Sequence, residues 1–350
     1  DLTAIGVDTQ AIEFVRVTEV MDTVIEIIKK LIAQGYAYRA EDGSTYFSIK
    51  NYQEKYHNYG ALMGLKFMEG KKVNARIAND EYHKDELSDF ALWKAHSPDD
   101  GEIFWDDDEL GRGRPGWHIE CSAVNWKRFD GKTTHIHTGG IDLRFPHHTN
   151  EHAQSTPLYD PLPFVTHWFH SEHLLVDGKK MSKSLGNFLT LHDIYEQARH
   201  EKRPFDGLDI RYLVLDSHYR SQQNFNEQAL RYAHINRQQL YHHLKPSVRR
   251  ILPDGSPHTL DKKKIIDYLE HDLDTHALLT YLISFARSGG GISPDDTQFL
   301  DSVLGLQLSQ GMAAFQKSLS ETHSCDASDG RGGPTGVLPS NGCLDPSVAL

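Results

Sequence analysis

The stretch Gly178-Lys179-Lys180-Met181-Ser182-Lys183-Ser184-Leu185-Gly186-Asn187 is the part of the chain that points most directly to a fold class. It places three lysines, two serines and two glycines within ten residues. Lysines on a loop with glycines near both ends form a mobile cationic clamp, which suits a polyphosphate whose charge changes during a reaction. We therefore predict a phosphate-binding loop here.

Length and composition limit the possible classes of protein. The chain has 350 residues, enough for two or three domains, and its 38% hydrophobic and 25% charged content is typical of a globular protein in water. No apolar run reaches the length of a membrane span. Three scattered cysteines do not form a disulfide framework. We expect a protein of the reducing cytoplasm, without a membrane partner.

Charge is unevenly distributed along the chain. The net charge of −12 argues against a general nucleic-acid binder. The segment from Arg231 to Lys264 nevertheless carries eight lysines and arginines against two acids. Such a basic face binds a phosphate backbone, or it is a solvated helical face.

Hydrophobic spacing predicts the first elements. Apolar residues at helical intervals predict an amphipathic helix over 12–34 that ends at Gly35. A hairpin is predicted over 36–48, turning at 41–43. Residues 51–108 are polar, with one apolar island at 90–93, and resemble an irregular insertion rather than core.

Later segments predict a different organisation. The spacing predicts a tight turn at 113–116, a strand at 135–137, a helix from Pro146 through Gln154, and strand and loop over 164–175. Helical periodicity over 210–230 and 265–286 predicts a separate C-terminal helical domain. The segment after 322 is rich in Gly, Ser, Pro and Asp, so we expect a disordered tail.

Two clusters carry ligand chemistry. If Pro146 opens a helix, His147 and Glu151 stand at i and i+4 and project from one face. With a thiolate from Cys121 they offer three ligands that Zn²⁺ accepts. The alternative is a polar surface helix with a small core cysteine, since the chain has 22 histidines and chance pairs are common. Gly139-Gly140-Ile141-Asp142 precedes this cluster, and its Asp binds a ribose or an amine, or caps a turn.

Together these segments resemble cysteinyl-tRNA synthetase, a class I aminoacyl-tRNA synthetase. Lys180 to Ser184 spell the KMSKS signature of that class, and 113–123, 137–155, 180–188 and 215–226 resemble long motifs of the cysteine family. The resemblance covers about 18–306, and it includes the 90–94 segment as part of a connective insertion.

The resemblance implies an α/β fold and a domain order. It implies a Rossmann-type nucleotide-binding domain over 1–200, with its first part missing, a connective insertion over about 36–110 and the KMSKS loop at 178–188. A helical tRNA-binding domain over 201–321 and the tail over 322–350 would follow. A complete chain of this kind is expected to be a monomer.

The resemblance also implies a reaction and residue roles. Cysteine and ATP, with Mg²⁺, give cysteinyl-adenylate, and the cysteinyl group then moves to tRNA(Cys). Lys180 and Lys183 would neutralise the departing pyrophosphate, with Lys183, Asp142, Gly139 and Gly140 binding ATP. One Zn²⁺ per chain would be held by Cys121, His147 and Glu151, and would bind the substrate thiolate. The matching pocket residues are Trp117, His118 and His137.

Two family features have no counterpart in the sequence. A His-x-Gly-His segment of the HIGH type and an early Cys that is a fourth zinc ligand are both absent. We therefore expect an N-terminally incomplete chain that is inactive as a ligase by itself. Two other readings are a synthetase-like ligase that joins cysteine to an amino-sugar, and a non-catalytic zinc- or tRNA-binding remnant.

Overall fold

The chain forms two compact units. A computed structural model describes residues 1–64, 73–77, 87–182, 185–202, 204–244 and 258–315, with the single residues 69, 251, 253, 255 and 317. We call Ile12–His173 the α/β unit, and Asp1–Ala11 with Leu174–Leu350 the helical unit. Lys183 and the tail over 322–350 lie outside the described residues.

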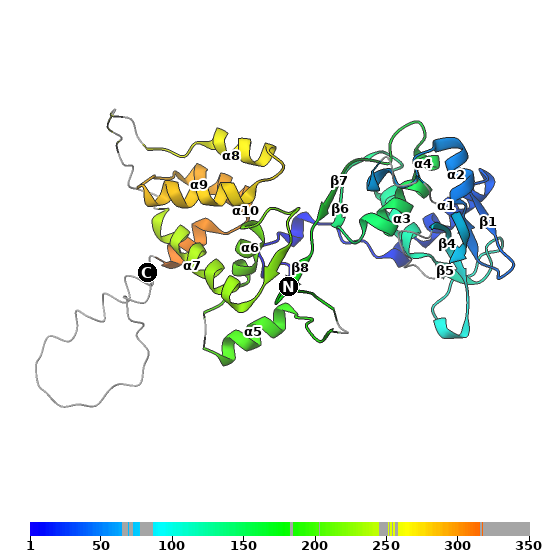
Figure 1. Cartoon of the computed structure of the whole chain (residues 1–350), viewed down its shortest axis with the longest axis horizontal. Helices are drawn as coiled ribbons and strands as arrows, with labels where there is room; N and C mark the ends of the chain where they lie inside the picture. Colours follow the sequence, from blue (N-terminus) through cyan, green and yellow to red (C-terminus); the bar gives the residue numbers. More distant parts are fainter. Residues whose placement is uncertain are drawn as a thin grey trace, which may run out of the picture. The chain divides into compact units, whose positions relative to one another are not determined.

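The α/β unit contains two sheets and the helices packed on them (Figure 1). Its elements are α1 Met21–Ala33, β1 Ala37–Arg39, β2 Thr45–Phe47, α2 Ile49–Tyr56, β3 Val73–Ile77, β4 Leu87–Ala95, β5 Gly113–Pro115, α3 Trp117–Arg128, β6 Thr134–Gly140, the single π-type turn η5 Arg144–His148, α4 Thr149–Tyr159 and β7 Val165–Ser171.

The first sheet has the order β1-β2-β4-β3, and β5 pairs with β4. The hairpin predicted over 36–48 is confirmed, because β1 and β2 pair antiparallel. The prediction that 51–108 is irregular and outside the core is wrong for β4. Phe90, Leu92 and Trp93 are buried there and share one core with α1. The tight turn predicted at 113–116 is instead β5, which extends this sheet.

Helix α1 is shorter than its apolar pattern predicted. It begins at Met21, because the buried stripe starts only at Val20, whereas Ile12 and Phe14 are exposed. Its predicted end is confirmed. Gly35 has a φ of 81°, and the Tyr36 amide donates to the Leu31 carbonyl at 2.9 Å, which closes the last turn.

The second sheet comes from a βαβ unit. Strand β6 pairs parallel with β7, with α4 in the crossover between them, which is the building block of nucleotide-binding folds. The strand predicted at 135–137 is confirmed within β6. The helix predicted from Pro146 is α-helical only from Thr149 to Tyr159. Residues 146–148 lead into it as the last part of η5, after a break at Phe145, which has strand-like angles (φ −142°, ψ 131°).

The helical unit has a small sheet of order β10-β8-β9 and a core of helices (Figure 1). Its elements are β8 Leu174–Val176, β9 Lys179–Lys180, α5 Leu191–His200, α6 Gly207–Leu215, β10 Gln223–Phe225, α7 Glu227–His243, α8 Lys262–Glu270, α9 Thr275–Arg287 and α10 Pro294–Leu304. In the described part of the chain, no helix is both long and apolar enough to cross a membrane.

Both predicted helical stretches of this unit are interrupted. Strand β10 divides 210–230, because it pairs parallel with β8. The stretch 265–286 breaks between α8 and α9, where Asp272 and Leu273 have φ values of 54° and 57°. Asp272 accepts hydrogen bonds from the Tyr219 hydroxyl and Arg220 Nε, both at 2.7 Å. These contacts fix a left-handed turn that non-glycine residues adopt rarely.

A buried ion pair joins α6 to α7. Arg237 Nε donates to Asp209 Oδ1 at 2.8 Å, and both side chains are almost fully buried. His234 Nδ1 lies 3.0 Å from the other oxygen of Asp209. Burial acts to raise the pKa of Asp209, but the hydrogen bond of His234 and the charge of Arg237 outweigh it. The pKa of Asp209 therefore lies below its ordinary value of 3.8.

This pair predicts an acid-sensitive helical unit. Because the folded pKa of Asp209 is depressed, its stabilisation is fully present above the unfolded value of 3.8 and is lost as the pH falls through the lower folded pKa. We expect amide exchange in α6 and α7 to accelerate in that acidic window. Asp209→Asn should flatten this dependence, and an unchanged pH profile in the variant would contradict it.

Candidate metal and substrate site

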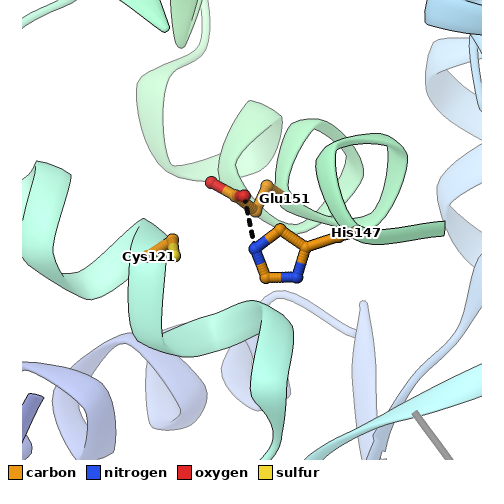
Figure 2. A group of neighbouring side chains, drawn as sticks. All are labelled: Cys121, His147 and Glu151. Atoms are coloured by element: carbon orange, nitrogen blue, oxygen red, sulfur yellow. Dashed lines mark ion pairs between the residues drawn. The ribbon is translucent and has the colours of Figure 1, made fainter. Parts of the chain in front are cut away.

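Three elements of the α/β unit converge on one buried point. Cys121 lies on α3, His147 in η5 and Glu151 on α4 (Figure 2). Helix α3 begins where the backbone of Gly116 packs against β4, since a Cβ there would lie 2.0 Å from the Ala91 carbonyl oxygen. Glycine is therefore required at this helix start, and the close approach positions Cys121.

The ligand atoms of this group are close together. Cys121 Sγ, one ring nitrogen of His147 and one Glu151 oxygen lie within 4.8 Å of one another. His147 Nε2 is 2.9 Å from Glu151 Oε1, as the dashed line in Figure 2 shows. The i, i+4 relation predicted for His147 and Glu151 holds even though α4 begins two residues after His147.

The electrostatics of this point favour a cation. Glu151 is 0% exposed, and although His147 Nε2 lies 2.9 Å from Oε1, neither carboxylate oxygen accepts a hydrogen bond of regular geometry among the described residues. A buried carboxylate without hydrogen bonds is costly unless a positive charge compensates it. Burial raises the pKa of the Cys121 thiol, and the carboxylates of Glu151 and Glu120 raise it further. A thiol in this setting becomes a thiolate only beside a cation.

The donor set fits zinc. One sulfur, one imidazole nitrogen and one carboxylate oxygen are ligands that Zn²⁺ accepts, and three protein ligands leave a position open for a further group. A contact on the side of the His147 ring away from Glu151 fixes the orientation of that ring, since His147 Nδ1 lies 3.0 Å from His118 Nδ1.

The predicted pocket residues surround this group. The Trp117 and His147 rings lie 4.3 Å apart, between centroids. Burial lowers the pKa of His118 well below its ordinary value of 6.5, so its ring is neutral. His137 Nε2 is 3.6 Å from Glu151 Oε2, the oxygen farther from His147. The structure thus brings together all six residues predicted for the metal and the pocket.

The glycines predicted for ATP have packing roles. Gly139 and Gly140 end β6, where a Cβ on Gly139 would lie 2.6 Å from His148 Cε1. A Cβ on Gly140 would lie 2.4 Å from Asp142 Oδ1. Asp142 itself is exposed in the turn that follows β6. The two glycines let His148 and Asp142 approach the strand end, which is compatible with ATP binding there but does not require it.

The lysines at 180 and 183 fall within the helical unit, whereas this cluster belongs to the α/β unit. Lys180 is exposed in β9 of the helical unit, where it pairs with Leu175. Asn187 Nδ2 donates to the Lys180 carbonyl at 3.1 Å, and Ser182 N donates to Asn187 Oδ1 at 2.9 Å. These bonds tie the two sides of the loop together. Lys183 lies outside the described residues.

Sequence reasoning missed two histidines of the site. His148 is 2% exposed, and its Nε2 lies 3.9 Å from Glu151 Oε1. On β7, His170 Nε2 lies 2.8 Å from His148 Nδ1. The His147-His148 doublet was visible in the sequence. His170 becomes a neighbour only through the register of β7, which pairs it with Gly139.

Comparison with known families identifies the class of protein. The family described as "tRNA synthetases class I (C) catalytic domain" matches residues 1–235. The chain belongs to this family, which confirms the class I synthetase fold predicted from the sequence.

Individual relatives narrow the likeness further. The chain is 43% identical over 283 residues to a cysteine–tRNA ligase of Chlamydia muridarum, covering 79% of this chain and 57% of that protein. A cysteine–tRNA ligase of Chlamydia trachomatis serovar D is 42% identical over 312 residues, covering 86% and 60%. That of Opitutus terrae is 42% identical over 292 residues, covering 81% and 59%. The chain thus spans less than two thirds of these relatives.

Proposed function

We propose that this chain acts in the ATP-dependent ligation of cysteine to tRNA(Cys). The single observation that carries the proposal is the buried group of Cys121, His147 and Glu151, in which the carboxylate has no hydrogen bond. Family membership and the cysteine–tRNA ligase relatives support it. A protein that charges tRNA works where translation occurs, so we place it in the cytoplasm.

Cysteine would be recognised at the group just described. One Zn²⁺ per chain would be held by Cys121, His147 and Glu151, and as a borderline-soft Lewis acid it would bind a thiolate in preference to the hydroxyl of serine. The protein's part is orientation. His118 holds the His147 ring by a 3.0 Å contact between their Nδ1 atoms, and Trp117 packs on that ring. His137 would line the same pocket, since its Nε2 lies 3.6 Å from Glu151 Oε2.

Activation would join the cysteine carboxylate to the α-phosphorus of ATP as the bond to pyrophosphate breaks. Negative charge would then build up on the departing pyrophosphate, and Mg²⁺ would supply a compensating positive charge. Lys180 and Lys183 would stabilise that charge, and a preorganised donor of this kind contributes about 3 kcal/mol. Asp142, Gly139 and Gly140 would contact ATP at the end of β6. The helices over 201–321 would then bind tRNA(Cys).

The proposal is tested by cysteine-dependent exchange of pyrophosphate into ATP. The absent HIGH-type segment predicts exchange at background by the chain alone, whereas the ligase activity proposed here requires that the chain, loaded with zinc, exchange above the background of heat-denatured protein when cysteine is present. Serine should support no exchange, because its hydroxyl is a poor ligand for the zinc. An exchange rate with cysteine at the denatured background would contradict a ligase activity of this chain.

The KMSKS loop at 178–188 supplies a matched pair of variants for the same assay. Lys180→Ala should lower the exchange rate about a hundred-fold, because one preorganised cation is lost. Lys179→Ala is the control, since neighbouring side chains of a strand point to opposite faces, and its rate should stay within about twofold. Equal losses in the two variants would argue against a specific role of Lys180.

A further inference from the structure

Glu151 faces imidazoles on both of its oxygens. Oε1 lies 2.9 Å from His147 Nε2, and Oε2 lies 3.6 Å from His137 Nε2. Figure 2 shows this second oxygen pointing away from the His147 ring. His148 Nε2 is also near the carboxylate, at 3.9 Å from Oε1. The ligand atoms of His137, His148 and Glu151 lie within 4.8 Å of one another, so they form a second group with ligand spacing.

The two groups cannot serve one ion as they stand. They share only Glu151, and no four ligand atoms among the described residues all lie within 4.8 Å of one another. Ligands of a single zinc ion are bound at about 2.0–2.3 Å, so any two of them are at most about 4.6 Å apart. The two sets therefore define two separate positions, with Glu151 between them.

Each position has the same kind of supporting contact. Histidine ligands usually have their other ring nitrogen held by a hydrogen-bond partner, which fixes the ring. His147 has this through His118, at 3.0 Å between the Nδ1 atoms. His148 has it through His170, at 2.8 Å between His148 Nδ1 and His170 Nε2. The second group is thus built like the first, with Nε2 of a buried ring directed at the carboxylate.

Contacts around the second group restrict its rings further. His137 packs on Trp168, with ring centroids 4.8 Å apart, and edge-on against His148 at 4.7 Å. His148 is 2% exposed, and Gly139 leaves room for its ring where a Cβ would lie 2.6 Å from Cε1. Rotation of either ring away from Glu151 is opposed by this packing, so the ligand atoms are held in place before any ion binds.

We propose that His137, His148 and Glu151 form a second divalent-metal position, with Glu151 as a carboxylate bridging it to the first. Two imidazoles and a carboxylate suit a borderline transition-metal ion such as Zn²⁺ or Co²⁺. The second position lacks a thiolate and shares its only negative charge, so it fills after the first and binds more weakly. The inference rests on the proposed function only in taking Cys121, His147 and Glu151 as the first position.

The test is a titration of the metal-free full chain with Co²⁺, followed by absorption. Charge transfer from the Cys121 thiolate in the near ultraviolet reports the first position, and visible ligand-field bands report both. We expect two equivalents, the first with the charge-transfer band and the second without it. One equivalent only, or a charge-transfer band that grows with both equivalents, would overturn the second position.

Variants separate the two positions. His148→Ala should weaken the second equivalent by more than about a hundred-fold and leave the first. His170→Ala, which removes only the supporting contact, should weaken it about 10- to 100-fold. His135→Ala on the same strand as His137 is exposed and should change neither. His137→Ala repeats the test at a less buried ring, in case His148→Ala does not fold. A second equivalent unchanged in folded His137→Ala and His170→Ala would overturn the assignment.

Cys121→Ser keeps this inference distinct from the proposed function. The variant should lose the charge-transfer band and retain ligand-field absorption from the second position. If the unaltered chain shows ligand-field bands but never a charge-transfer band, the second position is supported and the proposed zinc site of the ligase is contradicted. If the unaltered chain binds only one equivalent and shows the charge-transfer band, the zinc site of the ligase is supported and the second position is contradicted.

Discussion

Glu151→Gln is expected to abolish stoichiometric zinc binding. The carboxylate is completely buried, it lacks a hydrogen bond in the described structure, and it faces both His147 and His137. Glutamine keeps the shape but removes the negative charge. Loss of one partner of a buried charge pair costs about 3–5 kcal/mol, a factor of about 100–5000 in affinity. Zinc content after dialysis should fall from one ion per chain to near zero.

Thermal unfolding gives a second measurement of the same change. All five tryptophans (93, 105, 117, 126 and 168) belong to the α/β unit, so their fluorescence reports its melting. A metal bound only by the native state stabilises it, so chelation should lower the midpoint of the unaltered chain. Glu151→Gln should show no response to the chelator.

The control for this variant is Glu54→Gln. Glu54 is exposed on α2 of the same unit, so it carries the same charge change away from the site. It should keep both the zinc and the chelator response. A Glu151→Gln protein that still binds one zinc with unaltered affinity would show that the buried carboxylate is not a ligand.

The ligand trio was accessible to sequence reasoning because most of it is local. His147 and Glu151 are separated by one helical turn, and that spacing survives even though α4 begins at Thr149. Cys121 was added to them as a third ligand type that Zn²⁺ accepts, and the resemblance to a known family implied the same three ligands. The supporting contact of His170 was not accessible, because it depends on the register that places His170 beside Gly139. Contacts across strands need the pairing, which a single sequence does not contain.

The errors at β4, β5 and β10 share one physical origin. Each of these segments was not predicted as a strand and became one where a neighbouring strand satisfied its backbone groups. Strand β4 lies between β2 and β3, and β5 extends the same sheet at 113–115. In the helical unit, β10 forms because β8 is beside it. Helix α1, whose buried stripe is set by its own periodicity, was predicted with an accurate C-terminal end.

Arg237→Ala is expected to destabilise the helical unit by about 3–5 kcal/mol, because it leaves the buried carboxylate of Asp209 without its cation. Arg237 is 2% exposed and Asp209 0%. The guanidinium also donates to the Tyr241 hydroxyl at 2.9 Å, which in turn donates to the Leu306 carbonyl at 2.7 Å. The substitution therefore removes the hydrogen bonds and ion pair that connect α6, α7 and the segment after α10. Amide exchange in α6 and α7 should accelerate.

Helix α7 also provides a control for Arg237→Ala, and a second substitution at Asp209 tests whether the lost stability comes from the uncompensated charge. Arg231→Ala removes an exposed pair with Glu227 at i, i+4, which contributes at most about 0.5 kcal/mol. If the cost of Arg237→Ala comes from the uncompensated charge, adding Asp209→Asn should recover part of the lost protection, since the remaining group is neutral. A double variant no more stable than Arg237→Ala would instead assign the loss to packing. Tryptophan fluorescence should be unchanged throughout, because the helical unit contains no tryptophan.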